Sequence, residues 1–173
     1  MSGMARELGF LPDRLDRIGT HIQTNYLDTG KLPFAALLIG RGDEVAYLWN
    51  SGVEADAIFR IASMTKPITS VAFMQLVEQG KVALSDPVAR YLPEFAKLGV
   101  FVSGGGNQPF VTRPPAAPMR IIDLLRHTSG LTYSFQERTP VDAAYRKPDL
   151  ESWSNNSSQS FIDGLATVPL DFD

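Results

Sequence analysis

Residues 61–66 read Ile61-Ala62-Ser63-Met64-Thr65-Lys66 and place a serine three positions before a lysine, where an apolar, strand-like segment gives way to a helix. Positions i and i+3 share one face of a helix, so the Lys66 ammonium can fold back to the Ser63 hydroxyl. The positive end of the helix dipole disfavours a protonated lysine. Unpaired N–H groups at this end, including that of Ser63, can face a developing oxyanion. The spacing therefore predicts a serine that is activated without histidine.

A Ser-x-x-Lys tetrapeptide also occurs as an ordinary helix cap followed by a solvated lysine, so its surroundings decide the interpretation. An apolar helical pattern follows it from Thr65 to Gln79 and stops at Gly80. Further along, residues 124–131 read Leu-Leu-Arg-His-Thr-Ser-Gly-Leu. With these motifs in this order, the chain resembles the serine hydrolases of the β-lactamase fold: class C β-lactamases, DD-peptidases and family VIII carboxylesterases. The resemblance covers most of the chain from about Pro33 onward.

The resemblance implies an α+β, β-lactamase/transpeptidase-like fold, with an antiparallel sheet flanked by helices and a mostly helical domain. Residues from 1 to about 60 would give the N-terminal helix and first strands, and residues from about 61 to 173 the helical region with the Ser-x-x-Lys motif. In that family the remaining strands come from the C-terminal part of the polypeptide. We therefore expect residues 1–173 to be an N-terminal portion, completed by a companion C-terminal fragment or chain.

Periodicity and turn residues predict the individual elements. Helices are expected at 13–28, 65–79, 119–126 and 161–166, with a short helix opening at Ser85. Strands at 33–39 and 44–49 flank a predicted hairpin turn at 40–43. Because Gly104-Gly105-Gly106 and Pro114-Pro115 interrupt it, the segment 99–118 is expected to be a loop. The same coarse order of elements indicates an α+β or α/β architecture with few strands.

The predicted chemistry is acyl transfer through a covalent acyl-serine, with Ser63 as nucleophile and Lys66 as the base that local spacing supplies. An ordinary lysine has a pKa of roughly 10.4, so a lysine base needs surroundings that favour its neutral form. The resemblance implies a catalytic tyrosine and a second oxyanion donor that are expected beyond Asp173. Tyr133 follows the His-Thr-Ser-Gly turn too closely for that role, and is interpreted as a wall of the substrate pocket or as an ordinary half-buried aromatic.

His127 and Asp123 invite a Ser-His-Asp interpretation, which we reject. The two residues lie four positions apart at a helix end, where they can pair with each other or cap carbonyls. The Gly-x-Ser-x-Gly elbow of α/β-hydrolases is absent around Ser63. In the family that the chain resembles, the His-Thr-Ser-Gly turn is structural.

Composition excludes several other classes of function. A formal net charge of −3 and a pI near 5.4 give no basic surface for nucleic acid or for a membrane. The sequence has no cysteine and two histidines, His21 and His127, so neither a metal nor another cofactor is predicted. Residues 1–15 lack the apolar core of a signal peptide. A cytoplasmic protein fits these absences, and a chain whose leader was removed is the alternative.

Because β-lactamases and DD-peptidases need export, the sequence favours an intracellular carboxylesterase acting on short-chain esters. This activity is compatible with weak β-lactam hydrolysis on the side. A β-lactamase, a D-amino acid peptidase and an acyltransferase of the same fold remain open. A truncated relative that binds a partner without turnover is the alternative from another class, since the tyrosine and edge strand are missing.

Overall fold

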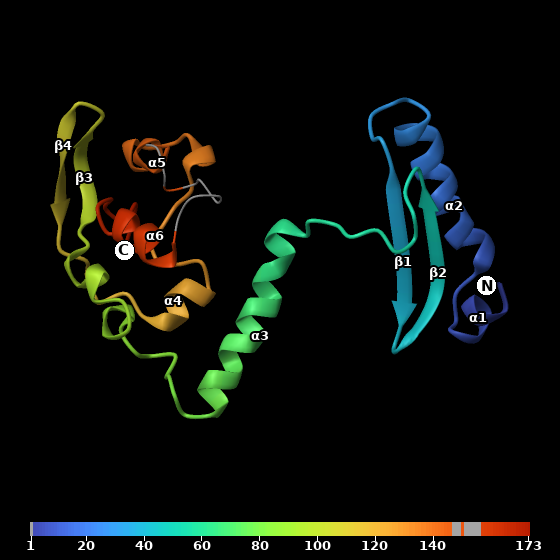
Figure 1. Cartoon of the computed structure of the whole chain (residues 1–173), viewed down its shortest axis with the longest axis horizontal. Helices are drawn as coiled ribbons and strands as arrows, with labels where there is room; N and C mark the ends of the chain where they lie inside the picture. The colour runs from blue at the N-terminus through green and yellow to red at the C-terminus, as the bar shows by residue number, and fades with distance from the viewer. Residues whose placement is uncertain (1, 147–149, 151–156) are drawn as a thin grey trace. The chain divides into compact units, whose positions relative to one another are not determined.

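The computed structural model describes residues 2–146, 150 and 157–173. Asn155 and Asn156, each of which begins an Asn-x-Ser sequence of the kind that accepts N-glycosylation, lie outside the described residues. The chain divides into two compact units, Met1–Ala62 and Ser63–Asp173. Each unit has its own two-stranded antiparallel sheet. Figure 1 labels the helices and strands of both units.

The first unit is a hairpin with helices along one side. Its elements are α1 (Ser2–Glu7), α2 (Pro12–Ile22), the π-helical turn η1 (Gln23–Leu27), β1 (Ala35–Arg41) and β2 (Glu44–Ser51). Helix α2 lies along β2 (Figure 1). The two are so close that a Cβ on Gly19 would lie 2.9 Å from the indole nitrogen of Trp49. The expected helix at 13–28 is thus an α-helix that loosens into a π-helical turn before Gly30.

The predicted hairpin of the first unit is confirmed, with a shorter turn. Strand β1 continues through Arg41, so the reversal falls on Gly42 and Asp43, where Gly42 adopts a φ of +60°. A glycine tolerates this left-handed conformation without steric cost. The register shifts by one residue between Ile39 and Gly40, which marks a β-bulge beside the turn.

The second unit carries the larger hydrophobic core. Its helices are α3 (Thr65–Glu78), α4 (Ile121–Leu125), α5 (Pro140–Tyr145) and α6 (Ser158–Leu165), and its strands are β3 (Val100–Gly105) and β4 (Gln108–Arg113). Short 3-10 turns complete it: η3 (Val88–Arg90), η4 (Pro93–Lys97) and η5 (Ser134–Gln136). A further 3-10 turn, η2 (Ala62–Met64), begins at the last residue of the first unit and leads into α3. The buried cluster joins residues from most of these elements: Val82, Val88, Phe95, Leu98, Val100, Ile121, Val141, Ala144, Tyr145, Leu165, Val168 and Leu170.

Helix α3 packs on this core along one side only. The sequence predicts the helix and its broad apolar face, and the structure confirms its bounds to within a residue. Phe73 and Val77 contact the core cluster. The other large apolar side chains of the helix are exposed in the described structure: Ile68, Val71, Met74 and Leu76. The helix therefore presents more apolar surface than the described residues cover.

The expectation of a loop at 99–118 is wrong, because β3 and β4 form a second antiparallel hairpin there. Gly104, Gly105 and Gly106 have φ values of +93°, +99° and +64°, so they bend and turn the chain within the hairpin. A Cβ on Gly104 would lie 2.1 Å from the carbonyl oxygen of Pro109. These glycines allow the two strands to approach each other closely and the chain to turn tightly between them.

We expect Gly104→Ala to destabilise the protein far more than Gly106→Ala. The Cβ at position 104 would collide with β4 as well as strain the backbone, at a cost of about 3 kcal/mol or more. A Cβ at position 106 meets no heavy atom within 4 Å, so only the backbone strain of about 1 kcal/mol remains. Urea unfolding of the two variants measures the difference, and equal losses would contradict this reading of the hairpin.

Asp142 is fully buried at the start of α5 and closes a loop. Its Oδ1 accepts a hydrogen bond of 2.6 Å from the Thr132 hydroxyl, and its Oδ2 accepts bonds of 2.8 and 3.1 Å from the amides of Arg138 and Thr139. The Thr139 side chain in turn accepts a bond from the Asp142 amide, which completes a capping box. One carboxylate therefore holds both ends of the segment 132–139.

Hydrogen bonding decides the ionisation of this carboxyl. Burial raises the pKa of Asp142, but bonds from the Thr132 hydroxyl and two backbone amides outweigh it, so the pKa lies below its ordinary value. The unfolded chain therefore binds a proton at a higher pH than the folded protein does. The stabilisation is complete above the pKa of an unfolded aspartate and is lost as the pH falls through the lower, folded pKa.

We expect Asp142→Ala to cost about 3 kcal/mol of unfolding free energy, because three donors lose a charged acceptor. Asp142→Asn should cost less, since its amide oxygen still accepts, and it should weaken the loss of stability in acid. The exposed Asp163→Ala serves as control and should stay within about 0.5 kcal/mol. Denaturant unfolding at neutral and acidic pH tests this, and an Asp142→Asn curve with the wild-type acid dependence would refute it.

Candidate functional site

Ser63 and Lys66 lie at the beginning of α3, where the structure brings their side chains together. Ser63 belongs to the 3-10 turn η2, one residue before the N-cap Met64, and Lys66 is the second residue of α3. The Lys66 Nζ donates a hydrogen bond of 2.9 Å to the Ser63 Oγ. The contact predicted from the i, i+3 spacing is present, although Ser63 precedes the α-helix instead of lying within it.

The backbone turns sharply just before Ser63. Ala62 has a φ of 45°, in the left-handed region that residues with a Cβ rarely occupy. Such conformations cost about 1 kcal/mol or more and are held in place by their surroundings. Ser63 directly follows this strained residue and lies just before α3. Both Ser63 and Lys66 are exposed in the described structure.

The Ser63–Lys66 contact can carry a proton in either direction. With a protonated lysine, the ammonium donates to the serine hydroxyl. With a neutral lysine, the hydroxyl donates to the amine along the same contact, which is the arrangement that a base needs before the serine attacks a carbonyl. A separation of 2.9 Å suits both arrangements.

Tyr133 lies beside Lys66, far from it in the sequence. The Lys66 Nζ is 6.0 Å from the centroid of the Tyr133 ring, at the outer range of a cation–π contact. The Tyr133 ring stacks on Phe135 with centroids 4.9 Å apart and planes inclined by 26°. The structure thus brings together all three residues that the sequence selects, and adds Phe135, which sequence reasoning missed.

The turn at residues 127–130 leads the chain toward Tyr133. His127 has a φ of 57° and Gly130 a φ of +78°. Gly130 is buried against the end of the chain, where its carbonyl accepts a bond of 2.8 Å from the Asp171 amide. A Cβ at this glycine would lie 2.3 Å from the Phe172 carbonyl oxygen. The close packing and the positive φ together explain why this turn has a glycine at position 130.

Asp123 forms its ion pair with Arg120, not with His127. The two Asp123 oxygens accept bonds from the Arg120 guanidinium at 3.1 and 3.2 Å, and one also accepts from the Arg120 amide. These bonds hold the pKa of Asp123 below its ordinary value. Of the two structural roles considered for these residues, pairing with each other or capping carbonyls, the first does not apply to Asp123, whose partner is Arg120. The rejection of a Ser-His-Asp triad agrees with this geometry.

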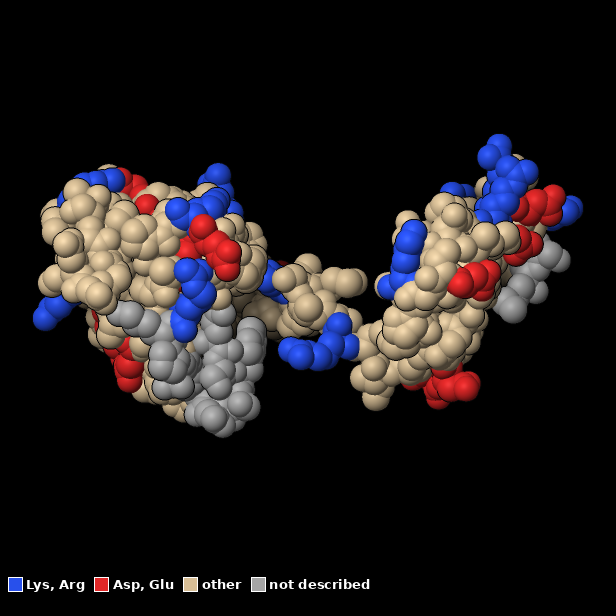
Figure 2. Space-filling view, turned by 90° about the horizontal axis from the view of Figure 1, so that it is seen from above, with Lys and Arg blue, Asp and Glu red and all other residues tan. Residues whose placement is uncertain are grey.

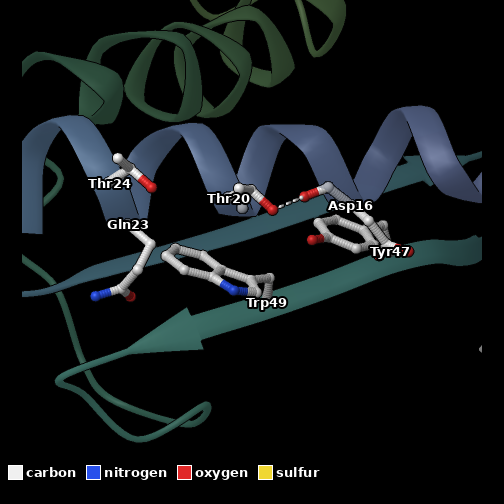
Figure 3. A pocket seen from close by; sticks show the side chains of 7 residues that line it. Asp16, Thr20, Gln23, Thr24, Tyr47 and Trp49 are labelled. Carbon is white, nitrogen blue, oxygen red and sulfur yellow. Dashed lines mark hydrogen bonds between the residues drawn. The ribbon is translucent and has the colours of Figure 1, made fainter.

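Two hollows of the described structure are lined by residues other than Ser63 and Lys66. One of about 350 Å³ lies in the first unit, where Asp16, Thr20 and Gln23 of the helical segment face Tyr47 and Trp49 of β2 (Figure 3). The other, of about 490 Å³, lies in the second unit between the β3–β4 hairpin, α5 and α6. Neither of these two hollows is lined by Ser63 or Lys66.

On the face that Figure 2 shows, charged side chains do not mark a binding surface. Figure 2 shows lysine, arginine and acidic side chains interspersed over the visible face, most of which is uncharged. Among the described residues, no group of three histidine, cysteine or acidic side chains is arranged to hold a metal ion. No helix within residues 2–146 or 157–173 is long and apolar enough to cross a membrane.

Similar proteins are known by sequence and by structure. Protein Rv1367c of Mycobacterium tuberculosis is 41% identical over 118 residues, which are 68% of this chain and 28% of the relative. Esterase EstB of Burkholderia gladioli is 37% identical over 112 residues, covering 60% of this chain and 26% of the esterase. The chain thus spans little more than a quarter of the length of either relative.

A solved structure shares the fold. EstCE1, a hydrolase with promiscuous acyltransferase activity, superposes with a TM-score of 0.66 at 26% identity, covering 90% of this chain and 40% of EstCE1. The sequence model of the beta-lactamase family matches residues 21–173, which include Ser63, Lys66 and Tyr133. The chain belongs to the beta-lactamase family and has its β-lactamase/transpeptidase-like fold.

Proposed function

We propose that this protein is a serine hydrolase that cleaves short-chain carboxylic esters through an acyl-serine intermediate on Ser63. The observation that carries the proposal is the 2.9 Å contact between the Lys66 Nζ and the Ser63 Oγ. A nucleophile with a base in hydrogen-bond reach is the arrangement that acyl transfer requires. Weak β-lactam hydrolysis is compatible with the same intermediate.

In the first half of the reaction, the Ser63 oxygen attacks the ester carbonyl while its proton passes to a neutral Lys66. The Ser63 N–H, near the positive end of α3, stabilises the oxyanion of the tetrahedral intermediate. The bond to the alcohol then breaks, and the proton held on Lys66 passes to the leaving alcohol oxygen. Tyr133 forms a wall of the substrate pocket beside Lys66.

In the second half, water attacks the acyl-serine. Its proton returns through Lys66, the bond between the acyl carbon and the Ser63 oxygen breaks, and the carboxylic acid leaves. An acceptor alcohol in place of the water would give a new ester. Acyltransferase activity is therefore the second candidate within the family, and the promiscuous acyltransferase activity of EstCE1 favours considering it.

A companion C-terminal portion is proposed to complete the site with a catalytic tyrosine and a second oxyanion donor. Two observations support it. The chain spans 28% of the length of Rv1367c and 26% of EstB. In addition, α3 exposes Ile68, Val71 and Met74, an apolar surface that a further part of the fold could cover.

Other activities share the acyl-serine chemistry. A β-lactamase or a D-amino acid peptidase would use the same nucleophile and base on an amide bond, so substrate panels distinguish them from an esterase. A non-catalytic relative that only binds a partner would retain the fold without turnover. The contact at Ser63 favours an enzyme over this alternative.

We expect Ser63→Ala to lower the hydrolysis of p-nitrophenyl acetate and butyrate about a thousandfold or more, because the nucleophile is lost. Lys66→Ala should cause a loss of similar order, since the two residues act as a unit. Activity is measured on the purified protein with any companion portion present, and mass spectrometry should detect an acetyl adduct on Ser63.

Ser70→Ala on α3 and the exposed Lys81→Ala serve as matched controls and should keep wild-type rates. An esterase activity that survives Ser63→Ala unchanged would show that another residue is the nucleophile. The absence of turnover, burst and acyl adduct in the wild-type protein would overturn the enzymatic proposal and favour a binding role.

A further inference from the structure

Two aromatic side chains next to the candidate base face outward instead of joining the core. Tyr133 is 43% exposed and Phe135 is 70% exposed, while their rings stack on each other. Large apolar side chains that form a joined exposed surface commonly mark a binding surface. The centroid of the Tyr133 ring lies 6.0 Å from the Lys66 Nζ. The same nitrogen donates a hydrogen bond to the Ser63 Oγ.

The loop that carries the pair is held firmly. The buried carboxylate of Asp142 binds Thr132 before the pair and Arg138 after it. From the far end of α5, the Arg146 guanidinium donates a bond of 2.5 Å to the carbonyl of Ser134, the residue between Tyr133 and Phe135 in the sequence. Ser134 itself is buried, unlike its two aromatic neighbours in the sequence. The aromatic surface is therefore preorganised, so a ligand would lose little entropy in ordering it.

The position of Lys66 decides which part of an ester would contact this surface. In the proposed mechanism, Lys66 delivers the proton from Ser63 to the oxygen of the departing alcohol, so that oxygen comes within hydrogen-bond reach of the Lys66 Nζ. The substituent attached to that oxygen then extends past the nitrogen. Among the described residues, Tyr133 is the aromatic residue whose ring lies beside the Lys66 Nζ. The Phe135 ring, which stacks on Tyr133, extends this aromatic surface.

We propose that Tyr133 and Phe135 form the binding surface for the alcohol part of the ester, and that the protein prefers esters of aromatic alcohols. The inference rests on the proposed function. By microscopic reversibility, the same surface would receive an acceptor alcohol when the acyl-serine is cleaved by alcoholysis. The pair thus favours benzyl-type alcohols over small ones, both as leaving groups and as acyl acceptors.

The test varies the two sides of the ester separately. The wild-type protein and Phe135→Ala are compared on benzyl acetate against methyl acetate, which changes the alcohol, and on methyl phenylacetate against methyl acetate, which changes the acyl group. We expect Phe135→Ala to lower the benzyl-to-methyl ratio of kcat/KM about fivefold, as suits the loss of one aromatic contact. The phenylacetyl-to-acetyl ratio should not change.

The exposed Phe161→Ala on α6 is the matched control and should keep both ratios. Acyl transfer gives a second measure: with added benzyl alcohol, Phe135→Ala should form less benzyl acetate relative to free acetate. A fall in the phenylacetyl ratio instead would assign the surface to the acyl group and overturn the proposal. The proposal would also be overturned if Phe135→Ala kept the wild-type benzyl-to-methyl ratio of kcat/KM and formed benzyl acetate and free acetate in the wild-type proportion.

A binding measurement separates the failure of this proposal from that of the esterase itself. In the Ser63→Ala protein, benzyl alcohol should shift the NMR amide signals of residues 132–139, and Phe135→Ala added to this variant should abolish the shifts. Shifts without turnover in the wild-type protein would keep the aromatic site and reject the esterase. Turnover without these shifts would keep the esterase and reject the aromatic site.

Discussion

The buried carboxylate of Asp142 organises the part of the second unit that faces the candidate base. It accepts hydrogen bonds from the two ends of the segment 132–139 and takes part in the capping box at the start of α5. One side chain thus fixes a loop and the helix that follows it. A buried charge is stable only when its hydrogen bonds are satisfied. The position of Tyr133 beside Lys66 therefore depends on a residue that contacts neither the base nor the serine.

Local spacing explains what the sequence predicts well. The Ser63–Lys66 contact needs only one helical turn, and the β1–β2 hairpin needs only neighbouring strands with glycines between them. Phe135 and Asp142 could not be found in this way. Their roles depend on which surfaces become buried and on contacts between residues distant in the sequence. The Thr139-Pro140-Val141-Asp142 pattern is a start signal for a helix that could have revealed α5.

The glycines of the second hairpin show why the same residues can predict different structures. Three consecutive glycines favour a loop when the backbone is considered by itself. In the structure they occur where β3 and β4 approach each other, and Gly104 leaves room for the Pro109 carbonyl. The flanking residues Val100, Phe101 and Phe110 carry the apolar character expected of strands, which the glycines obscured.

Ala62 exposes a trade-off at the edge of the candidate site. Its left-handed backbone is a conformation that alanine resists and glycine accepts. A glycine would relieve the strain in the folded protein but would also let the unfolded chain explore more conformations. At the residue just before Ser63, strain in the folded state and entropy in the unfolded state therefore act in opposite directions on the free energy of unfolding. An engineer who replaced Ala62 to raise the melting temperature would change both at once.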